Sequence, residues 1–153
     1  MANRFPLIVD STNNNIKELP SGDNLDMTGS GFANLASLSP TAISATAYNE
    51  TAVTVTSSSN ATAISCALGN TVIHSLSENT TFSFTNAPSS GASFAFTLKL
   101  IQDSTARTVT WPTLKWAAGT APTITTTSGG IDVFVFYHDG TGWFGFTAGQ
   151  AMA

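Results

Sequence analysis

Charged side chains are scarce in this chain. They make up 9% of its 153 residues, whereas an average soluble domain carries roughly 25%. The surface must therefore be kept soluble by hydroxyls and amides, which fits the 24 threonines and 18 serines of the sequence. Highly charged disorder is excluded, because there is too little charge and too much phenylalanine for it. Low charge also weakens repulsion between copies, which suits a protein that packs against itself.

Positive charge is rare and is not clustered. The formal net charge is −4, and the five basic residues are spread among nine acidic ones: Arg4, Lys17, Lys99, Arg107 and Lys115. Binding to nucleic acid normally requires a clustered basic patch that releases counterions. We therefore expect no nucleic-acid partner.

A single cysteine and the lack of a long apolar run exclude two further classes. Cys66 has no partner for an internal disulfide, and we interpret it as a small buried hydrophobe rather than a nucleophile. No apolar run approaches the ~20 residues of a membrane span, so we expect no membrane partner. The first residues, Met-Ala-Asn-Arg-Phe-Pro, lack the charged and then apolar layout of a signal peptide.

Residue types that carry catalysis are few and isolated. His74 has no carboxylate nearby in the sequence, and His138 precedes a turn beside Asp139. Both histidines are interpreted as ordinary strand residues rather than as bases. The nucleophile pattern Gly-x-Ser-x-Gly does not occur. We predict a non-enzymatic protein with no catalytic and no cofactor-binding residues, and hence no cofactor.

Two patterns admit a ligand-binding interpretation beside a structural one. Asp23 and Asp26 could touch Ca²⁺ in a loop, but the segment lacks the oxygen-rich alternation of an EF-hand, which favours turn capping. Trp111, Trp116 and Trp143 could form a platform on which sugars stack, although packing in the core or at a subunit contact is favoured. We predict no metal site and keep glycan binding as an alternative.

A change in composition near residue 50 divides the chain. Residues 1–50 hold only scattered apolar groups, which cannot offset an ordering cost of ~1–2 kcal/mol per residue. They predict an extended N-terminal attachment arm with an extended segment at 5–9, a turn at 20–23 and one helical turn at 33–38. Residues 51–153 have a period of two and predict a separate β-domain.

The alternating pattern predicts that this domain is all-β. The turn at Gly69-Asn70 and the turn Asp139-Gly140-Thr141-Gly142 each predict a hairpin. Strands at this spacing are typical of a β-sandwich or jelly-roll-like fold. The expected strands are 52–56, 61–68, 71–76, 80–85, 92–102, 107–111, 114–116, 122–127, 131–138 and 143–147.

Phenylalanine is concentrated in four Phe-x-Phe pairs, at 82/84, 94/96, 134/136 and 144/146. Each pair places two rings on one side of a strand, and we predict that all of these rings are buried, worth roughly 12–24 kcal/mol at ~1.5–3 each.

The segment 131–138 is apolar on both faces, because Val133, Val135 and Tyr137 alternate with Phe134 and Phe136. Such a strand is covered twice, either centrally in a sandwich or at a subunit contact. This excess of apolar surface predicts an assembly subunit.

Two stretches resemble virion proteins of tailed bacteriophages, particularly marine cyanobacterial phages. Asn-Arg-Phe-Pro-Leu-Ile-Val-Asp at 3–10, followed by Ile-Lys-Glu-Leu-Pro-Ser-Gly-Asp-Asn-Leu-Asp at 16–26, is similar to the N-terminal segment of their fibre-like and other virion proteins. The second stretch runs from Glu-Asn-Thr-Thr-Phe at 78–82 through Val-Thr-Trp-Pro at 109–112 to Thr-Gly-Trp-Phe-Gly-Phe at 141–146. It is similar to a β-domain at the ends of phage fibre and particle-surface proteins.

The resemblance implies a virion component at the particle surface, made in the host cytoplasm and commonly homotrimeric. Its partners would be other virion proteins, either the major capsid protein or tail proteins. The chain is short and has no repeat shaft or coiled-coil heptads, which favours a capsid-surface decoration or cement protein. The alternative is a tail fibre or tail-appendage subunit that binds a receptor or a glycan.

Overall fold

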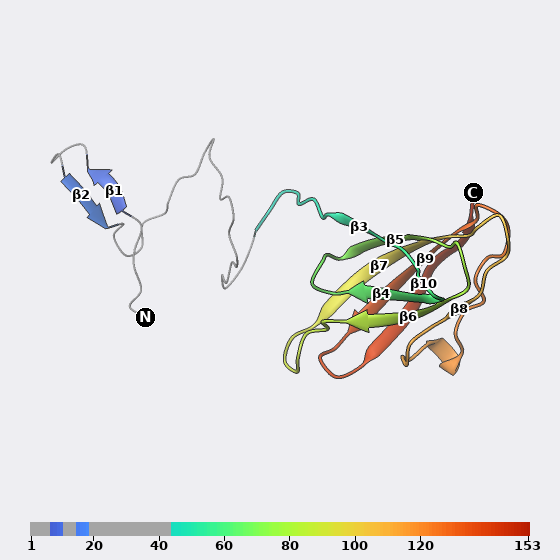
Figure 1. Ribbon diagram of the computed structural model, residues 1–153. Coiled ribbons are helices and arrows are strands. Elements are labelled where there is room, and N and C mark those ends of the chain that lie inside the picture. The colour runs from blue at the N-terminus through green and yellow to red at the C-terminus, as the bar shows by residue number, and fades with distance from the viewer. Residues whose placement is uncertain (1–6, 11–14, 19–43) are drawn as a thin grey trace. The chain divides into compact units, whose positions relative to one another are not determined.

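The computed structural model describes residues 7–10, 15–18 and 44–153, and the chain divides into two units at residue 45 (Figure 1). In the first unit, β1 (Leu7–Asp10) pairs antiparallel with β2 (Asn15–Glu18). The strand β1 overlaps the extended segment expected at 5–9, whereas no strand was expected at the position of β2.

Several expectations for the N-terminal part lie outside the described residues. These are the turn at 20–23, the helical turn at 33–38, and the two aspartates considered for Ca²⁺, Asp23 and Asp26. The division between the units, at residue 45, falls slightly before the change in composition near residue 50.

The second unit is all-β, as the alternating pattern predicts, apart from a short 3-10 helix, η1 (Ala117–Gly119). Its strands are β3 (Ala52–Val55), β4 (Ala61–Ser65), β5 (Thr71–Ser75), β6 (Thr80–Thr85), β7 (Phe94–Ile101), β8 (Val109–Thr110), β9 (Ile131–His138) and β10 (Trp143–Met152).

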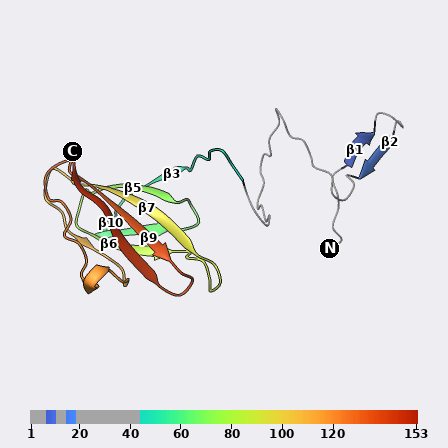
Figure 2. The ribbon, with the colours of Figure 1, turned by 180° about the vertical axis from the view of Figure 1, so that it is seen from behind.

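These strands form two sheets, ordered β10-β9-β7-β5-β3 and β4-β6-β8 (Figures 1 and 2). From β3 to β8, successive strands alternate between the sheets, and neighbours within each sheet run parallel. The chain therefore winds as a coil of three turns. The strands β9 and β10 then add antiparallel to β7.

This topology corrects one expected hairpin. Gly69-Asn70 connects β4 to β5, which lie in different sheets, so the tight hairpin turn expected there is wrong. Gly69 has a φ of 149°, and a Cβ atom at this position would lie 3.1 Å from the carbonyl oxygen of Thr51. Gly69 thus lies where the chain crosses from one sheet to the other, and its lack of a side chain lets the backbone pass close to the preceding turn of the coil.

The antiparallel jelly roll is not confirmed, because the strands of the coil pair in parallel. A period of two is the same in parallel and antiparallel strands, so the sequence pattern could not distinguish them. The short strand expected at 122–127 does not form.

Both sheets contribute to one core. Its buried members come from β4, β5, β6, β7 and β9, together with Leu76, which follows β5 directly. They are Ile64, Val72, Leu76, Phe82, Phe96, Leu98, Leu100, Phe134 and Phe136.

One of the four Phe-x-Phe pairs does not belong to this core. Phe144 and Phe146 lie on the outer face of the five-stranded sheet, and Phe146 is 53% exposed. The residue between them, Gly145, is the one that faces inward, beside Phe136. The prediction that all eight rings are buried is therefore wrong for this pair.

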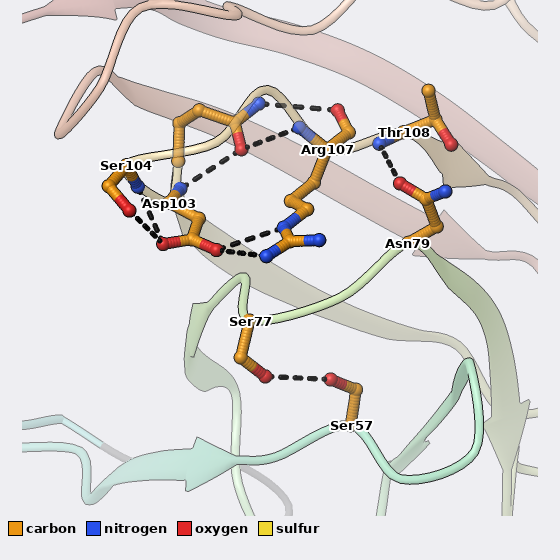
Figure 3. A network of polar contacts seen from close by, with 8 residues as sticks. Ser57, Ser77, Asn79, Asp103, Ser104, Arg107 and Thr108 are labelled. Carbon is orange, nitrogen blue, oxygen red and sulfur yellow. Dashed lines mark hydrogen bonds and ion pairs between the residues drawn. The ribbon is translucent and has the colours of Figure 1, made fainter.

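Polar side chains tie successive turns of the coil together at one of its corners (Figure 3). The hydroxyls of Ser57 and Ser77 lie 3.5 Å apart, and these residues follow β3 and β5. Asn79 Oδ1 accepts a hydrogen bond from the Thr108 backbone N–H at 3.0 Å, which joins the second turn to the third. These contacts join successive turns of the coil without any charged group.

The long connection between β7 and β9 is anchored by two buried polar side chains. Gln102 Nε2 donates to the carbonyl oxygen of Thr125 at 2.8 Å, and its Oε1 accepts from the Arg107 backbone N–H at 3.1 Å. Asp132 accepts the Thr125 backbone N–H at 2.7 Å and the Ala151 backbone N–H at 3.0 Å. The connection is thus fixed to β7, β9 and the bulged end of β10.

Candidate interaction surface

An apolar surface covers the outer side of β9 and β10. The pairing of these strands places Tyr137 beside Phe144 and Val135 beside Phe146, all pointing away from the core. Tyr137 is 40% exposed. We call this surface, formed by Val133, Val135, Tyr137, Phe144 and Phe146, the outer patch.

The hairpin turn determines which residues form the outer patch. The turn has four residues, Asp139–Gly142, and leaves His138 paired with Trp143. Two positions further along each strand, Phe136 is therefore opposite Gly145 on the inner face. Phe144 and Phe146 must then point outward, because successive side chains of a strand alternate between faces.

Two lysines border the outer patch. Lys115 Nζ lies 5.1 Å from the centre of the Phe144 ring, a cation–π distance. The backbone of Lys115 is hydrogen-bonded to Trp143 and Gly145, which adds residue 115 to the edge of β10. Lys99 of β7 is paired with Val133 of β9.

A cavity of ≈ 290 Å³ lies beside the outer patch. It is lined by Tyr48, Glu50, Asn70, Thr97 and Val135, among others. Tyr48 is 78% exposed, and the Glu50 carboxylate accepts the Thr71 hydroxyl at 3.0 Å. An exposed aromatic ring and a carboxylate thus lie next to a surface that carries lysines.

The outer face of the three-stranded sheet is different in character. Its exposed residues are small or bear hydroxyls: Ala61, Ala63, Thr81, Ser83 and Thr85. The outer face of β4 and β6 therefore lacks the large apolar side chains that the outer face of β9 and β10 carries.

The histidines are built into the strands. His74 is fully buried on β5, and its Nδ1 lies 2.8 Å from the carbonyl oxygen of Val55. His138 ends β9, accepts the Gly140 N–H at 3.1 Å through Nδ1, and packs on Trp143 with ring centres 4.8 Å apart. The positions of both agree with their interpretation as structural strand residues.

The turn of the β9–β10 hairpin is organised by Asp139. Its Oδ1 accepts the hydroxyl of Thr141 at 2.7 Å and the backbone N–H groups of Thr141 and Gly142, each at 2.8 Å. These bonds, above all the one from the Thr141 hydroxyl, lower the pKa of Asp139 from 3.8 to about 2. The charged carboxylate is therefore favoured in the folded state.

We expect Asp139→Asn to remove a pH-dependent part of the stability. The folded-state pKa lies below the unfolded one, so the stabilisation is complete above about pH 4 and is lost as the pH falls through about 2. Urea unfolding of both proteins between pH 7 and pH 2 should show the wild type more stable at neutral pH and the gap closing in acid. A gap that stays constant across this range would contradict the assignment.

The three tryptophans pack against the core. Trp111 stacks on Phe82 with ring centres 5.3 Å apart, and Trp143 contacts Phe84 edge-on at 4.9 Å. Trp116 contacts Phe136 at 5.8 Å, and all three rings are half-buried. These contacts favour the packing interpretation over a platform formed by the three tryptophans together.

Three further observations concern the described residues. Cys66 is buried, and burial raises the pKa of its thiol, which fits a small hydrophobe. In the part of the chain that the structure describes, no cluster of three His, Cys, Asp or Glu could hold a metal ion. Within the same residues, no helix has the length and apolar character needed to cross a membrane.

The outward orientation of Phe144 and Phe146 was not expected from the sequence. The length of the turn could have indicated it, because a four-residue loop between His138 and Trp143 fixes which residues of the two strands are paired. The apolar outer side of β9 at Val133, Val135 and Tyr137 was identified from the sequence.

No protein-family model, curated protein or solved structure matches this chain.

Proposed function

We propose that this chain is a non-enzymatic structural subunit of a phage virion, most simply a capsid-surface decoration or cement protein. The observation that supports assembly is the outer patch, where Phe146 and Tyr137 are 53% and 40% exposed on one side of the domain. Exposed aromatic clusters of this kind mark contacts between proteins. The virion setting comes from the resemblance of residues 3–26 and 78–146 to phage proteins.

Two sheets share one core, as in a β-sandwich, while the strands alternate between them as in a short parallel coil. We take the domain as a sandwich wound in this way, with the outer patch as the contact between copies in a homotrimer. Residues 1–50 serve as the attachment arm to the major capsid protein.

A tail appendage that binds a glycan is the second candidate. It is supported by a cavity of ≈ 300 Å³ lined by Trp116, Thr120, Pro122, Phe146 and Thr147, among others. Half-exposed aromatic rings beside hydroxyls are a suitable surface for a sugar. Copy number separates the candidates: a decoration protein occurs in hundreds of copies per particle, and a handful of copies would contradict the first proposal.

Substituting the outer patch should dissociate the subunits. We expect Phe146→Ser combined with Tyr137→Ser to weaken self-association roughly tenfold or more, because the contact between copies loses both aromatic rings. Sedimentation of the full chain at micromolar concentration measures this. Ser83→Ala and Thr85→Ser, on the solvated face, are the matched control and should change nothing. A wild-type chain that sediments as a monomer would contradict the homotrimer.

A further inference from the structure

The outer face of the five-stranded sheet carries charges of opposite sign at its two edges. Lys115 is bridged to Phe144 at the edge formed by β10, and Glu50 lies two residues before β3, at the other edge. Both residues are exposed. Among the described residues neither takes part in an ion pair, since the pair found there joins Arg107 to Asp103. Each edge therefore presents one charge to its surroundings.

Both charged side chains lie on the outer side of the sheet. Lys115 Nζ lies 5.1 Å from the centre of the Phe144 ring, and Phe144 points outward. The Glu50 carboxylate accepts the Thr71 hydroxyl at 3.0 Å. Val72 of β5 faces the core, so its neighbour Thr71 is on the outer side, and Glu50 lies there with it.

A transverse row of paired residues crosses the sheet from the β10 edge. Each member is paired with the next, and the row runs through Lys115, Phe144 of β10, Tyr137 of β9 and Ala95 of β7. The rings of Tyr137 and Phe144 have centres 6.0 Å apart. The row therefore begins with a cation and continues through the outer patch.

The same row ends at Glu50. The strands β3, β5 and β7 are parallel, and Ala52, Thr71 and Thr97 are paired across them. Two residues earlier on each strand, Glu50 is therefore level with Ala95. Neighbouring strands are about 4.8 Å apart, so the five intervals from Lys115 to Glu50 span roughly 24 Å. This is far beyond the ~4 Å of an ion pair, so the two charges cannot pair within one chain.

We propose that Lys115 of one copy pairs with Glu50 of the next copy in the homotrimer, so that the β10 edge of each outer face meets the β3 edge of its neighbour. The inference rests on the proposed function in taking the assembly as a trimer. A three-fold ring joins two different surfaces at each contact, and the two edges of this face differ in charge. Rotation about an axis parallel to the strands keeps every residue at its level, so the two ends of the row meet without a shift.

The Glu50 edge also carries an exposed aromatic ring. Glu50, Tyr48 and Val135 all line the cavity of ≈ 290 Å³ beside the outer patch, and Tyr48 is 78% exposed. When Lys115 of the next copy reaches Glu50, the Phe144 ring below that lysine arrives at the same edge. The contact therefore covers aromatic side chains, which are enriched in the cores of protein interfaces.

A second lysine on the same face provides a matched control. Lys99 is paired with Val133, and it lies four residues beyond Ala95 on β7. At about 3.3 Å per residue, Lys99 is roughly 13 Å from the row along the strand direction. Reversing its charge therefore changes the charge of the face by the same amount at a position outside the proposed pair.

Charge reversal in the full chain, followed by sedimentation over a range of concentrations, tests the pairing. Glu50→Lys and Lys115→Glu each place like charges at the contact, and we expect either one to raise the concentration of half-assembly roughly tenfold. The double variant Glu50→Lys with Lys115→Glu should assemble like the wild type, which also shows that neither substitution prevents folding. Glu50→Lys with Lys99→Glu is the control and should remain as weak as Glu50→Lys alone.

The outcomes separate this inference from the proposed function. If Phe146→Ser with Tyr137→Ser dissociates the trimer but the double reversal fails to restore assembly, the trimer stands and the pairing of Lys115 with Glu50 is overturned. Restoration by Lys99→Glu instead of Lys115→Glu would overturn the pairing as well. A wild-type dimer whose assembly the double reversal restores would contradict the trimer and keep the pair, whereas a monomeric wild type would overturn both.

Discussion

Phe136→Ala is expected to destabilise the domain by about 3–5 kcal/mol, the cost of removing a large ring from a packed core. The Phe136 ring is fully buried, with ring centres of Phe84 and Phe96 at 4.9 and 5.1 Å and that of Trp111 at 5.4 Å. The neighbouring rings come from both sheets, so they cannot fill the space left by the Phe136 ring unless the two sheets move closer together. Urea unfolding followed by tryptophan fluorescence measures the loss.

Phe146→Ala is the matched control, since it removes the same ring from the same hairpin. Phe146 is 53% exposed, so the loss of stability should stay below about 1 kcal/mol at a concentration where the chain is monomeric. Equal losses in the two variants would show that Phe146 is buried as well, and that the outer patch does not exist as described.

Gly145→Ala is expected to cost about 1–3 kcal/mol, in the range found for overpacked cores. An added Cβ atom would lie 2.6 Å from Trp116 Cζ3 and 2.8 Å from Leu114 Cδ1. Residue 115 is hydrogen-bonded to Trp143 and Gly145, so the segment cannot retreat without losing these bonds. The measurements are the free energy of unfolding and the change in tryptophan emission as Trp116 is displaced.

Gly142→Ala provides the control, in the turn of the same hairpin. A Cβ atom at Gly142 would meet nothing within 4 Å. We therefore expect a change below about 0.5 kcal/mol, as for an ordinary surface substitution. A fully stable Gly145→Ala protein with unchanged fluorescence would mean that Trp116 does not pack over β10.

The β-strands were largely predictable because their cause is local. The Phe-x-Phe alternation and the turn Asp139–Gly142 identified β9 and the beginning of β10, and the structure has β9 at Ile131–His138. The interpretation of the two histidines as strand residues, and of Cys66 as a small buried hydrophobe, also followed from their neighbours in the sequence. Their environments agree with it: His74 and Cys66 are buried, and His138 packs on Trp143.

The outward orientation of Phe144 and Phe146 and the inward orientation of Gly145 could not be predicted from the period of two in the sequence. In Trp143-Phe144-Gly145-Phe146 the alternation defines two faces without saying which is inside. The partner strand decides, because Phe136 and Trp116 fill the space that Gly145 leaves. An aromatic pair therefore ended on the outside while a glycine was buried.

By itself, the sequence determined that this chain forms β-strands with excess apolar surface and little charge. The alternation of apolar residues and the residue types of turns involve residues close together in the sequence, so both can be recognised before the fold is known. Only the tertiary structure decided that successive strands alternate between two parallel-paired sheets, which makes β3 and β4 edge strands. Parallel pairing joins residues such as Ala52 and Thr71, a full turn of the coil apart, and no local signal reaches that far.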